Sequence, residues 1–537
     1  MDTERRIAII GAGVAGLAAC RHALARGLNP VVFEGEGRIG GLWAQTIEST
    51  KLQTPRWYYE FPDFPWPSSV QETYPHNTKV LNYIESYAQH FGLLPYIKLR
   101  SKVISLDYVG VSEEEMQSWE LWGGTGLAFG SKGKWNLLVE HTVADPHHPS
   151  STDSTHTNIK EYVAEFVVIC TGKFSGLGNI PEFPPGKGPE VFEGKVIHSV
   201  EYGAMDNESA AQLIKGKKVA VVGSQKSAVD IAAECANANG PKKACTLIQR
   251  TVNWILPGAY IMGVSLFALF GNRFTELLVH KPGESFIQSI LATLLTPLLW
   301  GLNKFVEMYL RWTYPLNKYK MIPKHSLLEQ AYACKLFWLP DNFYEKVEEG
   351  SLILKQSNNL SFCKQGLLLD SDQSEPIKAD LVILATGYKS QEKLRNLFTS
   401  KTFQNYIISP TSSLLALYRQ MIPPRIPGIA IIGHSESFAN LYTFDVRCQW
   451  LAHFLDEKLK MPSIKEMEKD VEEWEKYMRK YSGEVYRGPC IGGLHIWYND
   501  QLCRDVGCNP RRNKGWLLDL VHPYAPPDYV AFATTPK

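Results

Sequence analysis

The sequence has few of the features that point to nucleic acid, a metal or a disulfide-stapled fold. Its 56 Lys and Arg against 55 Asp and Glu leave a formal net charge of +1, so there is no broad basic field for a phosphate backbone. The 10 cysteines form no CxxC pair and no zinc-ligand spacing, and the closest pair, Cys503 and Cys508, has no further Cys or His beside it. These absences argue against nucleic-acid binding, a metal site, a dithiol redox centre and a secreted disulfide scaffold.

The N-terminus also lacks a secretion signal. The first six residues lead into a strand pattern without an apolar signal segment or a cleavage site, which predicts a cytoplasmic chain. Two apolar stretches, Ile255 to Gly271 and Phe286 to Leu302, come near the ~18-residue minimum for a membrane span. We favour a helical insert buried over the active site. Membrane contact through residues 255–302, at the cytosolic face of the endoplasmic reticulum, is the less favoured alternative.

The first glycine motif directly follows an apolar run of strand type, Ile7 to Ile10, and precedes a helix-like segment, Leu17 to Leu24. Strand, glycine turn and helix in this order are typical of a dinucleotide-binding unit. The first glycine permits the tight turn, the second lets backbone approach a pyrophosphate, and the third lets the helix pack closely on the strand, with the helix N-terminus facing the phosphates. The motif reads Gly11-Ala12-Gly13-Val14-Ala15-Gly16.

The second strand of this unit, Asn29 to Phe33, ends in Glu34. A carboxylate about 20 residues after the glycine motif is placed to meet the ribose hydroxyls of a dinucleotide. It would repel a 2′-phosphate, so the first site is predicted to hold FAD or NAD rather than NADP.

A second glycine motif follows the strand pattern Lys217 to Val222 and reads Gly223-Ser224-Gln225-Lys226-Ser227-Ala228. Gln225 stands where the fingerprint has its second glycine, which weakens the match. The next strand pattern, Ala244 to Gln249, ends in Arg250, and a guanidinium there can fork onto a 2′-phosphate. The second site is therefore predicted to bind NADP, with a surface or ion-pair role for Arg250 as the alternative.

Two further buried-strand patterns end in small-residue turns. Phe166 to Ile169 leads to Thr171 and Gly172, and Leu381 to Leu384 leads to Thr386 and Gly387. Turns of this kind let a chain cross between two nucleotide units with little bulk.

Between the two glycine motifs, Phe192 to Tyr202 fits the pattern FxGxxxHxxxY, a fingerprint of flavin-containing monooxygenases. The chain resembles this family from Ile7 to about Pro510, and no motif is assignable between about Ile255 and Asn317. Within the family it looks most like the plant branch with a Gly-x-x-Lys-Ser-Ala second motif, which includes the enzyme that N-hydroxylates pipecolic acid. Further similar stretches are Glu34 with Gly40, Gly41, Leu42 and Trp43, then Asp63-Phe64-Pro65, Tyr83 to Leu93, and the LATGY stretch ending in Tyr388.

The expected fold is α/β, with two Rossmann-like dinucleotide-binding domains and the NADP domain inserted into a discontinuous FAD domain. A length of 537 residues agrees with several domains around a shared cleft, which favours an enzyme. We expect the first part of the FAD domain at 1–212, the NADP domain at 213–374 with a mostly helical apolar insert at about 255–330, the second part of the FAD domain at 375–455, and a C-terminal helical and coil segment at 456–537 that packs on the FAD domain.

The resemblance implies an NADPH- and FAD-dependent monooxygenase that uses a C4a-hydroperoxyflavin to oxygenate a nucleophilic nitrogen or sulfur with O2. An amine, amino acid or thioether would be the substrate, and N-hydroxylation is the leading expectation. Gln53 is the catalytic candidate, because it stands ten positions before the Asp-Phe-Pro segment, where many family members carry an Asn that touches the reactive flavin edge. His198 more plausibly orders the segment between the domains than transfers a proton.

The cofactor-binding candidates are Gly11, Gly13, Val14, Ala15, Gly16, Glu34, Gly41, Leu42, Trp43, Gly223, Ser224, Ser227, Ala228, Arg250, Thr386 and Gly387. Two alternatives remain open: oxidative decarboxylation of a keto acid, and a non-catalytic nucleotide-binding redox sensor. A flavin disulfide reductase is argued against by the missing CxxC pair.

Overall fold

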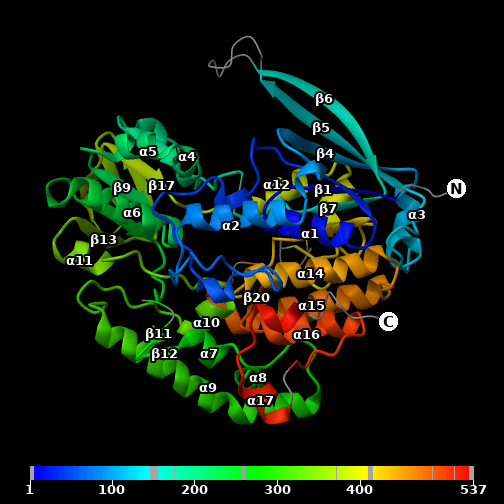
Figure 1. Ribbon diagram of the computed structural model, residues 1–537. Coiled ribbons are helices and arrows are strands. Elements are labelled where there is room, and N and C mark those ends of the chain that lie inside the picture. Colours follow the sequence, from blue (N-terminus) through cyan, green and yellow to red (C-terminus); the bar gives the residue numbers. More distant parts are fainter. Residues whose placement is uncertain are drawn as a thin grey trace.

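The computed structural model describes residues 5–144, 155–174, 176–256, 258, 260–370, 372–408, 415–486, 488–512 and 515–530. Two five-stranded parallel sheets organise this part of the chain (Figure 1). The first sheet has the strand order β18-β7-β1-β2-β3. Its strands are β1 (Arg6–Ile10), β2 (Asn29–Phe33), β3 (Ile97–Lys98), β7 (Phe166–Ile169) and β18 (Ile429–Ile431).

The second sheet has the strand order β13-β10-β9-β17-β8, again with every neighbouring pair parallel. Its strands are β8 (Lys195–His198), β9 (Val219–Val222), β10 (Cys245–Gln249), β13 (Leu352–Gln356) and β17 (Leu381–Leu384).

Each sheet contains a strand–helix–strand unit that begins at a glycine motif. Helix α1 (Val14–Leu24) connects β1 to β2, and helix α6 (Lys226–Asn239) connects β9 to β10. The central strands are almost entirely buried, which is why they read as continuous apolar runs rather than as alternating patterns. The predicted α/β class with two Rossmann-like units, one inserted into the other, is confirmed.

The boundaries of the second unit differ from the expected ones at 212/213 and 374/375. Strand β8 pairs with β17, with His198 opposite Leu384, and β17 pairs in turn with β9. Both strands therefore belong to the second sheet, and the FxGxxxHxxxY segment is its edge strand with the following helix α4 (Ser199–Ala204) rather than a connection between domains. Only pairing between segments far apart in sequence reveals this.

The chain crosses between the two units twice, and the two crossings lie side by side. The amide of Asn179 donates to the carbonyl oxygen of Gly387 at 2.8 Å, and the amide of Lys389 donates to that of Leu177 at 2.9 Å. The second unit therefore extends from about 179 to about 387. Thr386 and Gly387 lie at the second crossing, as predicted, whereas Thr171 and Gly172 follow β7 and precede the first crossing by several residues.

Antiparallel hairpins and short helices complete the two units. Strands β4 (Ser101–Val109), β5 (Lys134–Ala144) and β6 (Thr155–Ala164) form one antiparallel sheet, and β14 (Leu360–Cys363), β15 (Gly366–Leu369) and β16 (Asp372–Lys378) form another. The other helices of the two units are α2 (Asn77–His90), α3 (Glu113–Gln117), α5 (Asn207–Ile214), α11 (Phe343–Glu348), α12 (Ser390–Asn396) and α13 (Lys401–Tyr406).

A helical insert leaves the second unit after β10 and returns before β13. Its ends meet where the amide of Leu256 donates to Phe337 and the amide of Leu339 donates back to Leu256. The insert contains the hairpin β11 (Tyr260–Ile261) and β12 (Val264–Ser265) and the helices α7 (Leu266–Phe270), α8 (Arg273–Leu277), α9 (Phe286–Thr313) and α10 (Leu327–Tyr332).

The C-terminal helices pack between this insert and the first unit. They follow α14 (Asn440–Leu455), which packs on α1, and comprise α15 (Ile464–Ser482), α16 (His495–Asp505) and α17 (Trp516–Val521), with a short strand pair β19 (Glu436–Ser437) and β20 (Cys490–Gly492). A disulfide between Cys334 of the insert and Cys490 ties the two regions together. Neither Cys503 nor Cys508, the pair closest in sequence, takes part in it.

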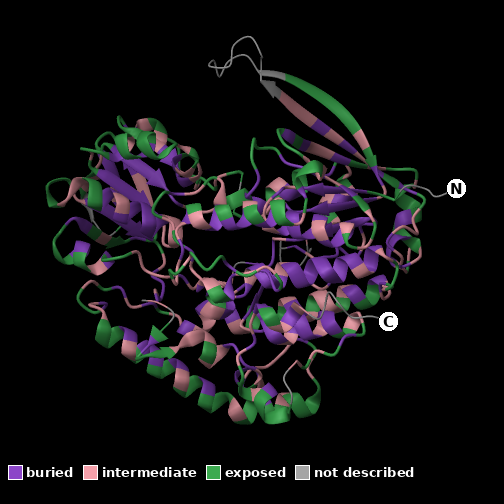
Figure 2. Cartoon of the chain, viewed as in Figure 1, coloured by how far each residue is buried: buried purple, intermediate pink, exposed green. Residues whose placement is uncertain are grey.

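The expectation that the insert is buried is wrong for its longest helix. Only 17% of the most apolar window of α9 is buried, although the helix is long and apolar enough to cross a membrane. Figure 2 shows α9 exposed along one edge of the molecule. Apolar periodicity indicates which residues avoid water, but it does not say whether protein covers them.

Candidate functional site

One continuous cavity of about 2350 Å³ joins the two glycine turns to the helical insert. A pocket for one small molecule usually measures about 300–1,000 Å³, so this cavity has room for two dinucleotides and a substrate. It lies outside the carboxyl ends of the parallel strands in both sheets, which is where ligands bind in open α/β folds.

The first glycine turn is shaped by the close approach of backbone segments. Gly11 has φ +105°, and a Cβ there would lie 2.6 Å from the carbonyl oxygen of Cys170. A Cβ at Gly16 would lie 1.9 Å from the carbonyl oxygen of Gly11. Gly13 is the N-cap of α1 in an extended conformation and lines the cavity, so the amides of the helix N-terminus are open to a phosphate.

Glu34 lies at the end of β2, buried and beside this turn. Its Oε2 accepts from the amide of Ala12 at 2.7 Å, and its Oε1 accepts from the amide of Glu36 at 2.9 Å. Each carboxylate oxygen has a second acceptor site, so the fixed carboxylate can still receive two ribose hydroxyls from the cavity.

Gly41, Leu42 and Trp43 form a short 3-10 turn on the opposite wall of the first site. A Cβ at Gly41 would lie 3.0 Å from Cα of Gly13, so two backbone loops touch where a side chain would separate them. The indole nitrogen of Trp43 donates to the hydroxyl of Tyr59 at 3.0 Å, which fixes this wall.

The second glycine turn repeats the first with different residues. A Cβ at Gly223 would lie 2.3 Å from the carbonyl oxygen of Ala385, so this glycine is required by space. Gln225 is the N-cap of α6 and has φ −112° and ψ −176°. Gly13, the N-cap of α1 at the equivalent position, has the similar angles φ −78° and ψ −176°. This backbone conformation is open to any residue, and Gln225 does not distort the turn. Ser224 and Ser227 line the cavity.

Arg250 follows β10, lines the same cavity and is exposed. Within the described part of the chain it makes no hydrogen bond or ion pair, so its guanidinium is available to a ligand. The neighbouring Asn253 donates from Nδ2 to the carbonyl oxygen of Ser224 at 2.9 Å and holds the turn. Burial raises the pKa of Asp230 to about 6, and its Oδ1 lies 2.5 Å from Nζ of Lys226.

Thr386 and Gly387 line the cavity at the second crossing. Nothing lies within 4 Å of the Cβ position of Gly387, so its backbone faces open space. His198 caps α4: its Nδ1 accepts from the amide of Val200 at 3.1 Å, and its own amide donates to Glu201 at 3.0 Å. It is buried, and burial lowers its pKa, in agreement with a structural role.

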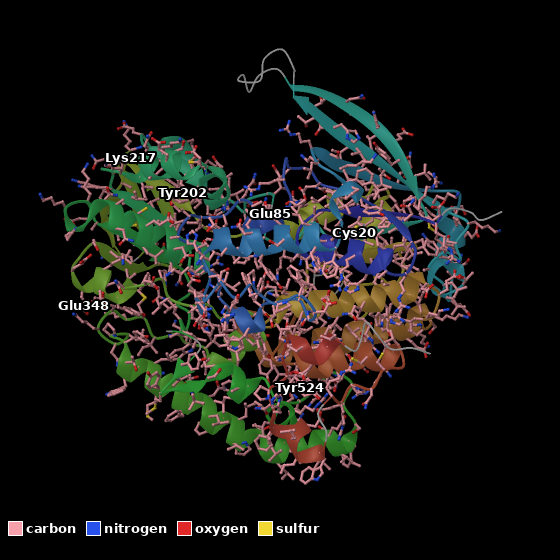
Figure 3. All side chains as sticks on the ribbon, in the orientation of Figure 1. Cys20, Glu85, Tyr202, Lys217, Glu348 and Tyr524 are labelled. Carbon is pink, nitrogen blue, oxygen red and sulfur yellow. A yellow bond between two sulfur atoms is a disulfide. The ribbon has the colours of Figure 1, made fainter. Side chains whose placement is uncertain are left out.

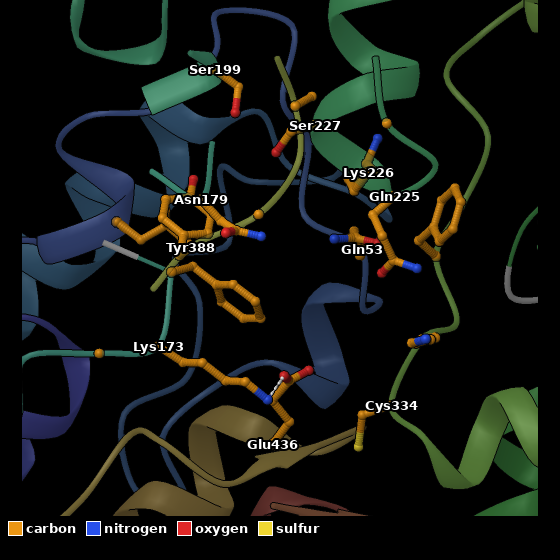
Figure 4. A pocket seen from close by; sticks show the side chains of 18 of the residues that line it. Gln53, Lys173, Asn179, Ser199, Gln225, Lys226, Ser227, Cys334, Tyr388 and Glu436 are labelled. Carbon is orange, nitrogen blue, oxygen red and sulfur yellow. Dashed lines mark ion pairs between the residues drawn. The ribbon is translucent and has the colours of Figure 1, made fainter. Parts of the chain in front are cut away.

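Gln53 lines the cavity on the loop that follows the Gly41 turn. Figure 4 shows it together with Gln225 and Ser227, which come from the second unit and point into the same space. Gln53 thus shares one cavity with both nucleotide turns and lies near the second of them.

Two of the predicted cofactor-binding residues, Gly16 and Ala228, do not line the cavity. They occupy the third position of the first and second motif, respectively. Ala228 is fully buried. Its Cβ would lie only 2.9 Å from a Cβ added at Gly223. Both residues pack against the glycine turns on the side away from the cavity and do not face a ligand.

Sequence patterns missed a charged pair in the cavity. Nζ of Lys173 lies 2.5 Å from Oε1 of Glu436, with both side chains largely buried, and Figure 4 shows this ion pair on the opposite side from Gln53. Burial and the two cations Lys173 and Lys393 lower the pKa of the nearby His434 to about 3. Position directly after β7 was the only signal that could have identified Lys173.

The insert encloses the far end of the cavity, called here the chamber, which was also missed. Its aromatic lining residues are Tyr58, Phe267, Phe270, Tyr332, Phe337 and Trp338. The hydroxyl of Tyr58 lies 2.8 Å from Nε2 of His495, and burial lowers the pKa of His495 to about 4. Both groups are therefore uncharged at neutral pH.

Glu276 is a fully buried acid lining this chamber. Its Oε1 accepts from the amide of Ile496 at 3.0 Å, and its Oε2 accepts from the amide of Trp497 at 2.9 Å, at the N-terminus of α16. Burial, with a smaller effect of Asp500, raises its pKa to about 8. The chamber is thus largely apolar, and Glu276 is a deep group in it that can take up or release a proton near neutral pH.

The residues present fit two dinucleotides. The first turn offers open helix amides, a gap kept by facing glycines and a ribose-facing carboxylate, while the second offers the same cradle and a cation in place of the carboxylate. A 2′-phosphate suits only the second site. A ligand in the chamber would meet both dinucleotides inside one cavity.

Comparison with known proteins gives consistent matches over nearly the whole chain. Residues 4–122 and 150–520 match a family model described as flavin-binding monooxygenase-like. The chain is 38% identical to probable flavin-containing monooxygenase 1 of Arabidopsis thaliana, over 98% of this chain and 96% of the relative. It is 35% identical to putative flavin-containing monooxygenase 2 of the same plant, over 95% and 99%.

Among solved structures, the OTEMO complex with FAD and NADP superimposes with a TM-score of 0.63, at 14% identity, over 94% of this chain and 98% of that chain. At this identity the likeness concerns the fold, and it agrees with two nucleotide units that share one cavity.

Proposed function

Because the chain belongs to the flavin-binding monooxygenase-like family, we propose that it N-hydroxylates a small amine or amino acid with an apolar side chain. It is a flavin-containing monooxygenase that uses FAD, NADPH and O2 to insert one oxygen atom into a small molecule. The nitrogen substrate is the part of this statement that needs a test.

The two glycine turns hold the two cofactors. FAD fits the first turn, with its pyrophosphate at the N-terminus of α1 and its ribose at Glu34, and NADPH fits the second, with its 2′-phosphate at Arg250. When bound, NADPH supplies hydride and the reduced flavin activates O2. The chain's own task is to orient these groups and the substrate and to exclude water.

The observation that carries the substrate proposal is Glu276 in the apolar chamber. Its carboxyl group is fully buried, and its pKa lies near 8. A substrate ammonium beside it would favour the charged carboxylate, and this carboxylate could then take up the ammonium proton and become the neutral carboxylic acid. This transfer leaves a neutral amine with a free lone pair, which is the form of nitrogen that can be oxygenated.

The aromatic lining favours substrates with an apolar body. Phe267, Phe270 and Phe337 offer no hydrogen bond, and the Tyr58–His495 pair is uncharged, so a second charged group on the substrate would find few partners there. Gln53 stands at the junction of the chamber and the nucleotide turns, where its amide can orient the flavin edge or the substrate.

The test is product analysis with the purified holoenzyme, NADPH and ¹⁸O₂. The panel contains an apolar amine, an apolar amino acid, a matched thioether and a keto acid. An N-hydroxylated product with one ¹⁸O atom supports the proposal. Label found only in a sulfoxide assigns sulfur instead, and CO2 release confined to the keto acid assigns oxidative decarboxylation. NADPH consumption that yields only H2O2 with every substrate contradicts the chosen substrate class.

A further inference from the structure

The outer face of the insert is apolar where water would meet it. Of the large apolar side chains that are exposed in the described part of the chain, most lie in the insert and in α17. On α9 these residues are Phe286, Ile287, Ile290, Leu291, Leu294, Leu298, Trp300, Phe305, Met308 and Trp312. Contiguous apolar surface of this kind marks an interaction site.

The exposed residues of α9 form a stripe opposite its buried face. At about 100° per residue, Ile287, Leu291, Leu294, Leu298, Phe305, Met308 and Trp312 fall on one side of the helix. The buried residues, Ala292, Leu299, Asn303, Val306, Glu307 and Leu310, fall on the other. The protein thus covers one side of the helix, and the apolar stripe on the other side stays exposed.

The packing of α9 is that of a helix that lies on a surface rather than across a bilayer. Both ends are held by the same folded body: α8 before it packs on α16, and α10 after it packs on α15. The buried face also contributes Leu299, Asn303 and Val306 to the chamber lining. A crossing would separate these contacts, whereas an in-plane orientation keeps them and covers only the stripe.

Helix α17 lies at the same end of the insert: it packs on α8, which in turn packs on α9. Its exposed apolar residues are Trp516, Leu517, Leu518 and Val521, with exposed fractions between 49% and 72%. It is anchored through its buried Asp519, whose Oδ2 lies 3.2 Å from Nε of Arg273 in α8 and whose Oδ1 accepts from the hydroxyl of Tyr524. Figure 3 shows Tyr524 among these helices.

The exposed charges of the segment from Arg273 to Lys320 are of one sign. Between Arg273 and Lys320 the exposed charged residues are all cations, namely Lys304, Arg311, Lys318 and Lys320, while Glu276, Glu284 and Glu307 are buried or half-buried. Lys304 and Lys318 have carboxylate partners in Glu307 and Glu348, but no described acid forms an ion pair with Arg311 or Lys320. Exposed cations beside apolar residues suit an anionic headgroup layer.

Two exposed tryptophans point to the same occupant. Trp312 on the stripe and Trp516 on α17 are 82% and 72% exposed, and indole rings favour the level of the headgroups, where one edge is apolar and the other wet. A second copy of this face would instead bring its cations against one another. We propose that α9 and α17 lie in the interface of an anionic lipid bilayer, with α9 as the wall between the lipid and the chamber.

The experiment is flotation of the purified full-length holoenzyme with vesicles. One set consists of phosphatidylcholine and the other of phosphatidylcholine with phosphatidylserine. We expect the protein to float with both and more strongly with the second, and we expect added salt to reduce this difference. A protein that stays unbound with both vesicle types overturns the proposal.

Matched variants locate the contact. Leu294→Ser, Leu298→Ser and Met308→Ser together remove three exposed side chains of the stripe, and vesicle binding should fall by about tenfold or more. The control combines Ile159→Ser, Val163→Ser and Ile353→Ser, which are exposed on β6 and β13, and should bind like the wild type. Melting temperature and flavin content verify that both variants fold.

Two results would contradict the lipid assignment. The first is equal vesicle binding by the stripe variant and the wild type. The second is a wild-type dimer in light scattering that the stripe variant abolishes, because the covered face would then belong to a second copy. NADPH oxidation without lipid is measured in parallel, and equal rates in both variants separate this outcome from a failure of the proposed activity.

Discussion

The two glycine turns share one backbone design but differ in the residues that form it. At the first motif position, a Cβ on Gly11 or Gly223 would strike a carbonyl oxygen of the adjoining crossing strand, at 2.6 and 2.3 Å respectively. At the second position, Gly13 and Gln225 have similar extended conformations that any residue can adopt. Space therefore demands the first glycine in both turns, while the backbone conformation at the second position does not require one.

The two turns differ at the third motif position. Gly16 has no room for a Cβ, since that atom would lie 1.9 Å from the carbonyl oxygen of Gly11, whereas Ala228 carries a Cβ that packs in the core of the second unit. The strand-end residues differ too, as Glu34 faces one ribose and Arg250 the other. A motif that departs from the glycine fingerprint can thus keep its geometry, and charge decides which dinucleotide each turn accepts.

The largest effect is expected at the third position of the first turn. Gly16→Ala should destabilise the protein by about 3 kcal/mol and remove bound FAD, because its Cβ meets backbone that cannot rotate away. The flavin-to-protein absorbance ratio and the melting temperature measure both effects.

The matched change in the second turn is Ala228→Gly. It removes a Cβ from a helix and should cost about 1 kcal/mol while FAD stays bound. Two results would contradict a glycine requirement that is confined to the first turn. One is stoichiometric flavin in Gly16→Ala, and the other is an equal loss of flavin in both variants.

The next effect separates the two strand-end residues. Arg250→Ala should raise the KM for NADPH about 10–100-fold, because a charge-assisted hydrogen bond contributes about 1.5–3 kcal/mol. The KM for NADH and the flavin content should not change, since neither involves a 2′-phosphate. Steady-state kinetics with the two nucleotides measures this selectivity.

The reciprocal variant is Glu34→Gln, which should lower flavin content and leave the NADPH to NADH preference intact. If Arg250→Ala affects NADPH and NADH alike, Arg250 does not read the 2′-phosphate. If it also releases more H2O2 per NADPH, the bound nucleotide shields the flavin site from water.

The glycine turns could be predicted from sequence because their determinants are local. An apolar run, a glycine at each tight approach and a charged residue at the next strand end all lie within about 35 residues. The structure places β2 at its predicted bounds, Asn29–Phe33.

The chamber and the unit boundaries could not be predicted because their determinants are far apart in sequence. Strand β8 joins the second sheet through β17, nearly two hundred residues later, and the chamber brings Tyr58, Glu276 and His495 together from three separate segments. The disulfide between Cys334 and Cys490 spans a separation of 156 residues. No local pattern carries such pairings.

A change in the chamber should leave both glycine turns untouched. We expect Glu276→Gln to raise the KM for an amine substrate about tenfold, while flavin content and the KM for NADPH stay constant. Burial raises the pKa of Glu276 to about 8, so the carboxylate that attracts an ammonium is gained as pH rises toward 8. The wild-type KM for the amine should therefore fall between about pH 6.5 and 8, and the variant should lose this dependence.

Glu284→Gln is the matched control for that measurement. Glu284 lies on the connection from α8, the helix that carries Glu276, to α9. It is paired with His280 and does not line the cavity. The same pH profile in both variants would show that Glu276 only caps α16. A profile that flattens in Glu276→Gln alone assigns the substrate contact.

The smallest effect is expected at the second position of the second turn, where the sequence departs most from the fingerprint. Gln225→Gly should change the KM for NADPH by less than about threefold, because the extended backbone at this N-cap does not depend on glycine and glycine is itself an acceptable N-cap. Gly13→Gln is the converse variant: it inserts a side chain beside Gly41, where backbone already meets backbone, and should lower flavin content. A large loss of NADPH affinity in Gln225→Gly would mean that the amide side chain itself binds the nucleotide. In that case the second turn would have exchanged a backbone contact for a side-chain contact, and the two turns would differ in how they hold phosphate as well as in which dinucleotide they select.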